Sequence, residues 1–143
     1  MTSLFTRVGC DVVEISRIQD KMSRKGGRFI DRLFTEREQE LAKGRAESFA
    51  AYFAAKEAFA KALGSGIMSD EALGFLDLEV QKDENGRPYL TWQDSVDELL
   101  EKRGQLLSHD ISLSHDGGIA MAICVLLFSK EGGRQWLDLA EGE

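Results

Sequence analysis

The strongest constraint on the fold is an alanine-rich stretch from Ala46 to Leu63 that is apolar on nearly every side. A helix without a continuous polar face has to be enclosed by other elements. Gly64 follows directly, and glycine commonly ends a helix. We therefore expect a central buried helix over 46–63, with the remainder of the 143 residues folded around it as one domain.

Helical spacing dominates before this helix, and strand patterns dominate after it. Capping boxes at Thr35 and Ser95 predict two helix starts, and Asn85-Gly86 predicts a tight hairpin turn. This order is typical of an α+β fold, with helices packed on a small antiparallel sheet. We expect the domain to cover 1–128 and the polar segment 129–143 to form a tail. The other expected helices cover 15–25, 35–44 and 95–104, and the expected strands cover 7–13, 75–81, 88–92, 110–114 and 119–128.

Composition argues against several protein classes. The net charge of −7 disfavours general nucleic-acid binding. The start of the chain lacks the apolar stretch of a signal peptide, and the apolar run 119–128 is too short to cross a bilayer. Cys10 and Cys124 lie among aliphatic residues, so we expect two small buried hydrophobes and no disulfide. Together these features favour a cytoplasmic protein.

Positive charge is nevertheless concentrated between Arg17 and Arg37, which hold seven basic and three acidic residues. Within this segment Arg17, Lys21, Arg24 and Arg28 are spaced as one face of a helix, although Gly26-Gly27 makes Arg28 the least secure member. Such a basic patch on an acidic protein suggests a specific acidic partner. A solvated helix face explains the same spacing equally well.

Three charged residues suggest a site for chemistry. Glu57 and Lys61 fall on the same stripe of the long helix as two alanines, which leave space in front of them, whereas Lys56 points elsewhere. Asp11 lies in an apolar strand, where an acid is costly to bury unless it is paired or bound to metal. Asp11 and Glu57 suit Mg²⁺, which takes oxygen ligands and keeps several waters. The alternative is that Glu57 and Lys61 only form a helix-stabilising i, i+4 pair.

Two further segments carry weaker signals. The glycines of Gly64-Ser65-Gly66 could expose backbone N–H groups to an anion, although a helix-ending glycine is the commoner explanation. The strand 110–114 runs into His115, which is either a functional or a structural histidine.

Taken together, these blocks resemble the holo-acyl-carrier-protein synthases, the short branch of the phosphopantetheinyl transferase superfamily. The resemblance covers about residues 8–128. It is found in Gly9-Cys10-Asp11 through Arg17-Ile18, in Phe53 through Gly66, in Asn85-Gly86-Arg87-Pro88 and in Ser112-Leu113-Ser114-His115. One departure is Tyr52, where the family usually has arginine. Arg45 lies seven residues earlier on nearly the same helical face and is the candidate to replace it.

The resemblance implies an enzyme that transfers 4′-phosphopantetheine from coenzyme A to a serine of an apo acyl carrier protein. It implies Mg²⁺ on Asp11 and Glu57 and a catalytic group of Asp11, Glu57, Lys61 and His115. Coenzyme A would be bound by Lys61, Gly64, Ser65, Gly66, Asn85, Gly86, Arg87, Pro88 and His115. Arg17, Lys21 and Arg24 would dock the carrier protein.

The resemblance also implies a homotrimer with sites between subunits. It leaves open which carrier protein is served, whether acyl-coenzyme A donors are accepted, and whether Glu57 or a metal-bound water takes the serine proton. A rival interpretation is a non-catalytic oligomeric module that binds a nucleotide or a carrier protein. The Asp11 and Glu57 pair distinguishes the two, because binding alone would not require it.

Overall fold

The computed structural model describes residues 2–64 and 73–131, and its fold is α+β as predicted. The helices are α1 (Ile15–Lys25), α2 (Gly27–Leu33), α3 (Glu36–Ala42), α4 (Ala46–Leu63) and α5 (Asp94–Glu101), with a short 3₁₀ helix η1 (Phe75–Asp77). The strands are β1 (Thr2–Glu14), β2 (Leu78–Lys82), β3 (Pro88–Trp92), β4 (Gln105–Asp116) and β5 (Ile119–Glu131).

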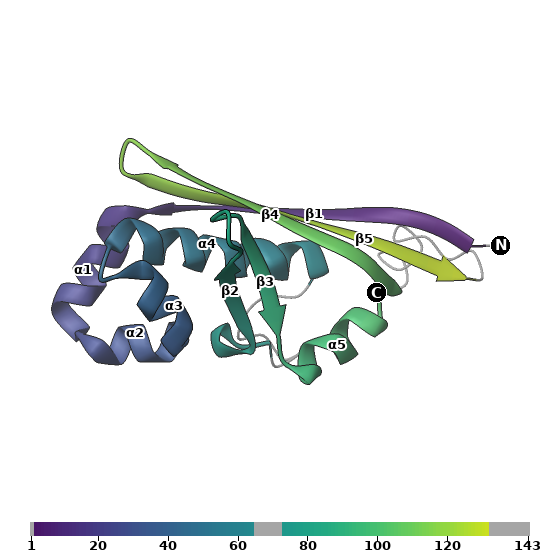
Figure 1. The fold of residues 1–143 in the computed structure, drawn as a ribbon, viewed down its shortest axis with the longest axis horizontal. Coiled ribbons are helices and arrows are strands. Elements are labelled where there is room, and N and C mark those ends of the chain that lie inside the picture. Colours follow the sequence, from purple (N-terminus) through teal and green to yellow (C-terminus); the bar gives the residue numbers. More distant parts are fainter. Residues whose placement is uncertain (1, 65–72, 132–143) are drawn as a thin grey trace.

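The main sheet has the antiparallel order β1-β5-β4, and α4 lies along one of its faces (Figure 1). The β2–β3 hairpin forms a second, two-stranded sheet beside α4 and β4. Successive residues of β5 alternate between the two faces of the main sheet, so Ala122 and Cys124 are buried while Ile123 and Val125 are exposed. No helix among the described residues covers the exposed face (Figure 1).

The buried helix α4 has the predicted bounds and touches the sheet at very short range. Gly9 of β1 lies against its backbone: a Cβ atom placed there would be 1.9 Å from the carbonyl oxygen of Ala58 and 2.6 Å from the nitrogen of Ala62. Only a residue without a side chain fits such a contact. Gly9 therefore sets how closely α4 approaches β1.

The strands of the main sheet are longer than predicted, because each one continues for as long as its neighbour pairs with it. β1 begins at Thr2 and β5 ends at Glu131, and these two residues pair in register. Ser129 to Glu131 thus belong to β5, although we expected a tail from residue 129. The strand 88–92 is confirmed, as is the capping box at Thr35.

The predicted starts of two elements are wrong. Phe75–Asp77 was expected as strand but forms η1, because the Asp77 carboxylate accepts a hydrogen bond from the Gly74 N–H at 2.7 Å and closes a local turn. The predicted capping box at Ser95 is absent, since α5 begins at Asp94 and its N-cap Gln93 makes no side-chain cap. The Asp97 carboxylate instead accepts a hydrogen bond from the Trp92 indole at 2.8 Å.

The two cysteines differ. Cys124 is buried as predicted, and burial raises the pKa of its thiol to about 12. The prediction of a buried Cys10 is wrong, because strand alternation places Cys10 on the exposed side of β1, next to the inward-facing Gly9. Across the described ranges 2–64 and 73–131, no helix is long and apolar enough to span a membrane.

Candidate active site

The structure brings Asp11, Glu57 and Lys61 together where α4 crosses β1. The Lys61 Nζ lies 3.0 Å from the Asp11 Oδ1, so the ion pair of Lys61 joins helix to strand instead of running along the helix to Glu57. The Asp11 side chain is 16% exposed and that of Lys61 is 54% exposed. The contact at Gly9, two residues before Asp11 on the same face of β1, positions the carboxylate against α4.

The ionisation of this cluster follows from its neighbours. Burial, and next the negative charge of Asp11, raise the pKa of Glu57, while Lys61 opposes the shift. The hydrogen bond to Asp11 raises the pKa of Lys61, which therefore keeps its positive charge at neutral pH. The cluster thus combines two carboxylates that repel each other with one accessible ammonium group.

This donor set fits a hard cation better than a transition metal. No three His, Cys, Asp or Glu side chains within 2–64 and 73–131 gather closely enough to hold a metal ion by themselves. Two carboxylates are nevertheless the usual protein share of a Mg²⁺ site, since Mg²⁺ takes its other oxygens from water and substrate phosphates. A divalent cation would also relieve the repulsion between Asp11 and Glu57 that contributes to the raised pKa of Glu57.

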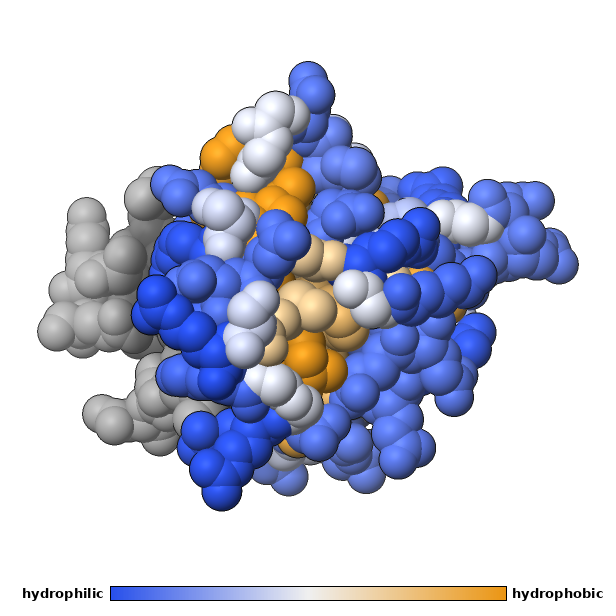
Figure 2. Space-filling view, turned by 90° about the vertical axis from the view of Figure 1, so that its left-hand side faces the viewer, coloured by the Kyte–Doolittle hydropathy of each residue, from blue (hydrophilic) through white to orange (hydrophobic). Residues whose placement is uncertain are grey.

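Glu57 also lines a groove of about 880 Å³ between α1, α2 and α4, which we call the basic groove. Its apolar floor includes Ile18, Phe29 and Phe53. Six cations surround this floor: Arg17, Lys21, Arg24, Lys25, Arg28 and Arg32. Figure 2 shows this end of the molecule, where hydrophilic side chains surround a smaller apolar patch.

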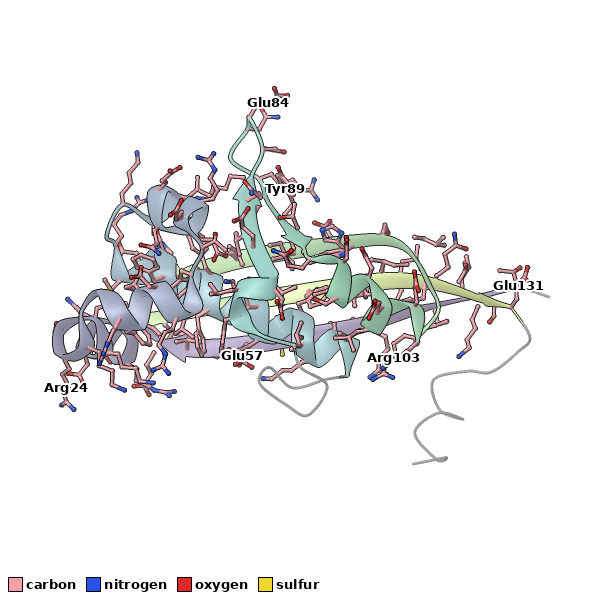
Figure 3. The ribbon with its side chains drawn as sticks, turned by 90° about the horizontal axis from the view of Figure 1, so that it is seen from below. Arg24, Glu57, Glu84, Tyr89, Arg103 and Glu131 are labelled. Carbon is pink, nitrogen blue, oxygen red and sulfur yellow. The ribbon has the colours of Figure 1, made fainter. Side chains whose placement is uncertain are left out.

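The predicted basic face is therefore continuous with the acidic cluster. Figure 3 shows Arg24 and Glu57 along the same edge of the molecule. Arg28 belongs to α2 and not to α1, yet it lines the groove with the three cations of α1 that spacing identified. Lys21 lies over the Phe29 ring, 5.7 Å from its centroid, and Arg24 forms an exposed ion pair with Asp20 at 3.4 Å.

The β2–β3 turn lies on the opposite edge of the molecule, where Figure 3 labels Glu84 and Tyr89. Asp83 organises this turn: its Oδ1 accepts hydrogen bonds from the backbone N–H groups of Asn85 and Arg87 at 2.8 and 2.9 Å. Gly86 has a φ of 82°, which a hairpin turn of this kind requires. Arg87 also pairs with Asp110 of β4 at 2.7 Å.

A second groove, of about 410 Å³, runs beside this turn and contains Arg87 and Pro88 with Asp110 to Leu113 of β4. His115 is exposed near the end of the same strand and pairs in register with Ala120. The strand β5 separates it from β1, and within residues 2–64 and 73–131 no hydrogen bond or ion pair joins His115 to Asp11, Glu57 or Lys61. The predicted site residues thus fall into two groups on different parts of one chain.

Three further predictions concern residues around α4. Gly64 is the helix C-cap, with φ 86° and its N–H donated to the Ala60 and Lys61 carbonyls, whereas Ser65 and Gly66 lie outside the described residues. Tyr52 is buried. Arg45 donates from its Nε to the Ala42 carbonyl at 3.1 Å, and therefore caps the end of α3.

Sequence reasoning missed one buried ion pair. Lys56 and Glu38 are 0% exposed, and the Lys56 Nζ lies 2.7 Å from the Glu38 Oε1. A lysine on a helix with no polar face was the available signal, since a buried charge requires a partner. The partner itself could not be identified, because Glu38 was already explained by its capping box.

Comparisons with known proteins support the family resemblance seen in the sequence. Residues 7–124 match the 4′-phosphopantetheinyl transferase superfamily. The chain is 38% identical over 128 residues to the holo-[acyl-carrier-protein] synthase of Campylobacter hominis, covering 86% of this chain and 98% of that protein. It is 42% identical over 122 residues to the same-named protein of a Sulfurovum species, covering 85% of this chain and 97% of that one.

Solved structures show the same fold. The Helicobacter pylori holo-[acyl-carrier-protein] synthase in complex with coenzyme A is 35% identical with a TM-score of 0.75, and the match covers 83% of this chain and 98% of that chain. An ACPS–CoA complex named for Chronobacterium ammoniagenes is 32% identical with a TM-score of 0.75, covering 87% and 98%. The chain belongs to the holo-acyl-carrier-protein synthases of the 4′-phosphopantetheinyl transferase superfamily.

Proposed function

We propose that this protein transfers 4′-phosphopantetheine from coenzyme A to a serine of an apo acyl carrier protein in the cytoplasm, in a Mg²⁺-dependent reaction. The products are the holo carrier protein and adenosine 3′,5′-bisphosphate. The observation that carries the proposal is the cluster of Asp11, Glu57 and Lys61, of which Glu57 also lines the basic groove. Relatives solved with coenzyme A bound support the choice of donor.

The acidic cluster suits transfer from a pyrophosphate ester. The serine Oγ attacks the phosphorus that bears pantetheine, and the bond from that phosphorus to the adenosine bisphosphate oxygen breaks. Such reactions depend on positioning and on neutralising charge over the phosphate oxygens. Mg²⁺ held by Asp11 and Glu57 supplies part of that neutralisation when it is bound. Lys61 supplies a further positive charge, since it stays protonated and more than half of its side chain is exposed.

Glu57 is well placed to act on the attacking serine. It lines the basic groove, and burial raises its pKa above the ordinary value for a glutamate. We assign the serine proton to Glu57 or to a water that it orients.

The basic groove is the proposed docking surface for the carrier protein, with Arg17, Lys21 and Arg24 as its first contacts. Opposite charges steer association and fix the orientation of the partners. The apolar floor between these cations gives the bound helix or loop of the carrier a surface to pack on. The reacting serine would then reach Glu57, which lines the groove.

The donor half of the site is proposed on the opposite edge. Asn85, Gly86, Arg87 and Pro88 would contact the adenine side of coenzyme A, and His115 the phosphates. Lys61 and the segment Gly64, Ser65 and Gly66 would complete the phosphate site. Arg87 and His115 lie apart from Asp11, Glu57 and Lys61 in one chain, so we propose that a complete site takes residues from two subunits.

We therefore propose a homotrimer. The face of the main sheet away from α4 exposes large apolar side chains, among them Leu4, Val8 and Val12 at 65, 61 and 58%. A continuous exposed apolar face marks a protein contact surface. A closed three-fold ring repeats one heterologous contact, which brings different parts of neighbouring subunits together.

The proposed function is tested by incubating the protein with coenzyme A, Mg²⁺ and apo acyl carrier proteins and weighing the carriers by mass spectrometry. A gain of one phosphopantetheine supports the enzyme, and the carriers that gain it identify the physiological acceptor class. Binding of both ligands without any mass gain would favour the non-catalytic binding module instead.

Sharing of the site between subunits has its own test. Glu57→Gln and His115→Ala proteins are dissociated, mixed and reassembled. If Glu57 of one subunit works with His115 of the next, mixing restores part of the activity, because some interfaces then pair two wild-type halves. Light scattering that reports a monomer at assay concentration, or mixed trimers that recover nothing, would place His115 within its own chain.

A further inference from the structure

The ammonium group of Lys56 is fully enclosed and fully bonded. Its Nζ donates to the Glu38 Oε1 at 2.7 Å, to the Leu33 carbonyl at 2.8 Å and to the Phe75 carbonyl at 2.7 Å. The Phe34 ring lies beside it, with the nitrogen 5.4 Å from the ring centroid. All three N–H donors of the ammonium are thus used, and none is left for substrate.

Glu38 completes the network from the other side. Its Oε1 also accepts a hydrogen bond from the Thr35 N–H at 2.9 Å, and its Oε2 accepts one from the Val80 N–H at 2.8 Å. The carboxylate therefore joins α3 to β2, while the ammonium joins α4 to the end of α2 and to η1. Burial lowers the pKa of Lys56, and Glu38 opposes that shift.

Three of the elements joined by this network, α2, α4 and η1, line the basic groove. Leu33 and Phe75, whose carbonyls accept from Lys56, both line the groove. Glu57, the next residue after Lys56 on α4, lines it too. Phe53 lies one turn earlier on the helix and stacks on Phe75, with ring centroids 5.1 Å apart. One buried ammonium group therefore bonds two groove walls to the helix that carries Glu57.

We propose that Lys56 and Glu38 are positioning residues for the carrier protein: they fix the separation of α2 and η1 from α4, and so the distance from the docked carrier to Glu57. This inference rests on the proposed function. The pair should therefore govern the carrier half of the site and leave donor binding at Arg87 and Pro88 largely unchanged, because no residue of the network lines the groove beside these two residues.

The test compares three proteins. The double variant Lys56→Met/Glu38→Gln removes both charges and keeps similar side-chain volume, so no unpaired buried charge remains. Glu38→Asp keeps the charge but withdraws the carboxylate by one methylene. Val96→Ala is the matched control: Val96 is buried on α5 and lies outside the network and the basic groove. Thermal unfolding and circular dichroism establish the folded fraction of each.

We expect the KM for the carrier protein to rise about tenfold or more in the two network variants, because α2 and η1 would no longer hold the basic groove at the width that the carrier fits. We expect the KM for coenzyme A to stay within about twofold, because the residues proposed to bind coenzyme A are unchanged in these variants. Val96→Ala should lose stability and change neither KM.

The opposite outcomes are equally clear. An unchanged carrier KM in folded network variants, or failure of both to fold while Val96→Ala folds, would assign the pair to fold stability alone and overturn the inference. A wild-type protein that modifies no carrier would instead reject the proposed function, and this inference would fall with it.

Discussion

Lys56 and Lys61 lie five residues apart on α4 and differ in burial and in hydrogen bonding. Lys56 is 0% exposed and donates to three acceptors, and burial lowers its pKa. The Lys61 side chain is 54% exposed, its described acceptor is the Asp11 carboxylate, and that contact raises its pKa. On one helix, all three N–H donors of Lys56 are used within the protein, whereas Lys61 keeps donors available for a phosphate.

The carboxylate partners differ in the same way. Glu38 is fully buried and accepts three hydrogen bonds, while Asp11 is 16% exposed and lies near a second acid, Glu57. The Lys56–Glu38 pair has all its hydrogen bonds made within the protein, so it resists change. Asp11, Glu57 and Lys61 have unused donors and acceptors, so they can exchange partners when a ligand binds. Burial therefore distinguishes Lys56, which has a structural role, from Lys61, which is available to a substrate.

The largest effect expected from this contrast is on stability. Lys56→Met leaves the Glu38 carboxylate buried without its cation, and should lower the free energy of unfolding by about 3–5 kcal/mol. Lys61→Met removes an exposed partner and should cost less than about 1 kcal/mol. Urea denaturation followed by circular dichroism measures both. Equal losses in the two variants would contradict the distinction.

Turnover, in contrast to stability, should depend most on the accessible acidic cluster. Asp11→Asn or Glu57→Gln is expected to lower turnover by at least about a hundredfold, or about 2.7 kcal/mol, the usual loss when a charge-stabilising group is removed. Both proteins should remain folded, since neither residue belongs to the saturated network. Turnover equal to the wild type at saturating Mg²⁺ would remove these two acids from the mechanism.

The exposed cations of the basic groove should behave like Lys61 and unlike Lys56. Changing Arg17 and Arg24 together to Glu should raise the carrier KM roughly tenfold, with a much smaller effect on the coenzyme A KM. Added salt should weaken the wild type in the same direction, because exposed charges are screened over about 10 Å at 0.1 M. Arg37→Glu serves as control, since Arg37 is exposed on α3 outside the groove. A carrier KM indifferent to both the substitution and salt would mean that the groove only faces solvent.

The smallest effect concerns Glu57 and pH. A raised pKa means that the folded protein binds the Glu57 proton more tightly than the unfolded chain does. This stabilisation is complete below the ordinary pKa of glutamate and is lost as the pH rises through the raised value. Glu57→Gln should therefore be as stable as the wild type near pH 4 and more stable than the wild type at pH 8, where the ionised Glu57 is partly buried and repelled by Asp11. A difference that stays constant between the two pH values would argue against a raised pKa.

Local patterns predicted much of the fold. The bounds of α4 and α1 were predicted without error, because an apolar run that a glycine ends and a regular 3.6-residue spacing are encoded in adjacent residues. Strand lengths were underestimated, since β1 continues to Thr2 only because β5 reaches Glu131 opposite it. The start of α5 was misplaced because Asp97 bonds Trp92, a contact that depends on the preceding strand.

The candidate site was predictable to the extent that its residues lie in short motifs. Asp11, Glu57 and Lys61 are separated in sequence, yet strand alternation and helical spacing point them at one another, and the structure joins Asp11 to Lys61. The hydrogen bond from Lys56 to Glu38 joins residues 18 positions apart in the sequence and depends on how α3 packs on α4. No periodicity encodes such a contact, so it emerged only with the tertiary structure.

The contact at Gly9 has a consequence for large-scale mutagenesis. A Cβ atom there would overlap the main chain of α4, and no change of side chain elsewhere relieves an overlap with backbone. In a saturation screen scored by growth, position 9 should reject all nineteen alternatives and be indistinguishable from a position that performs chemistry. Screens of this protein would therefore need a second score, such as the amount of soluble protein, before a fully intolerant position is assigned to the reaction.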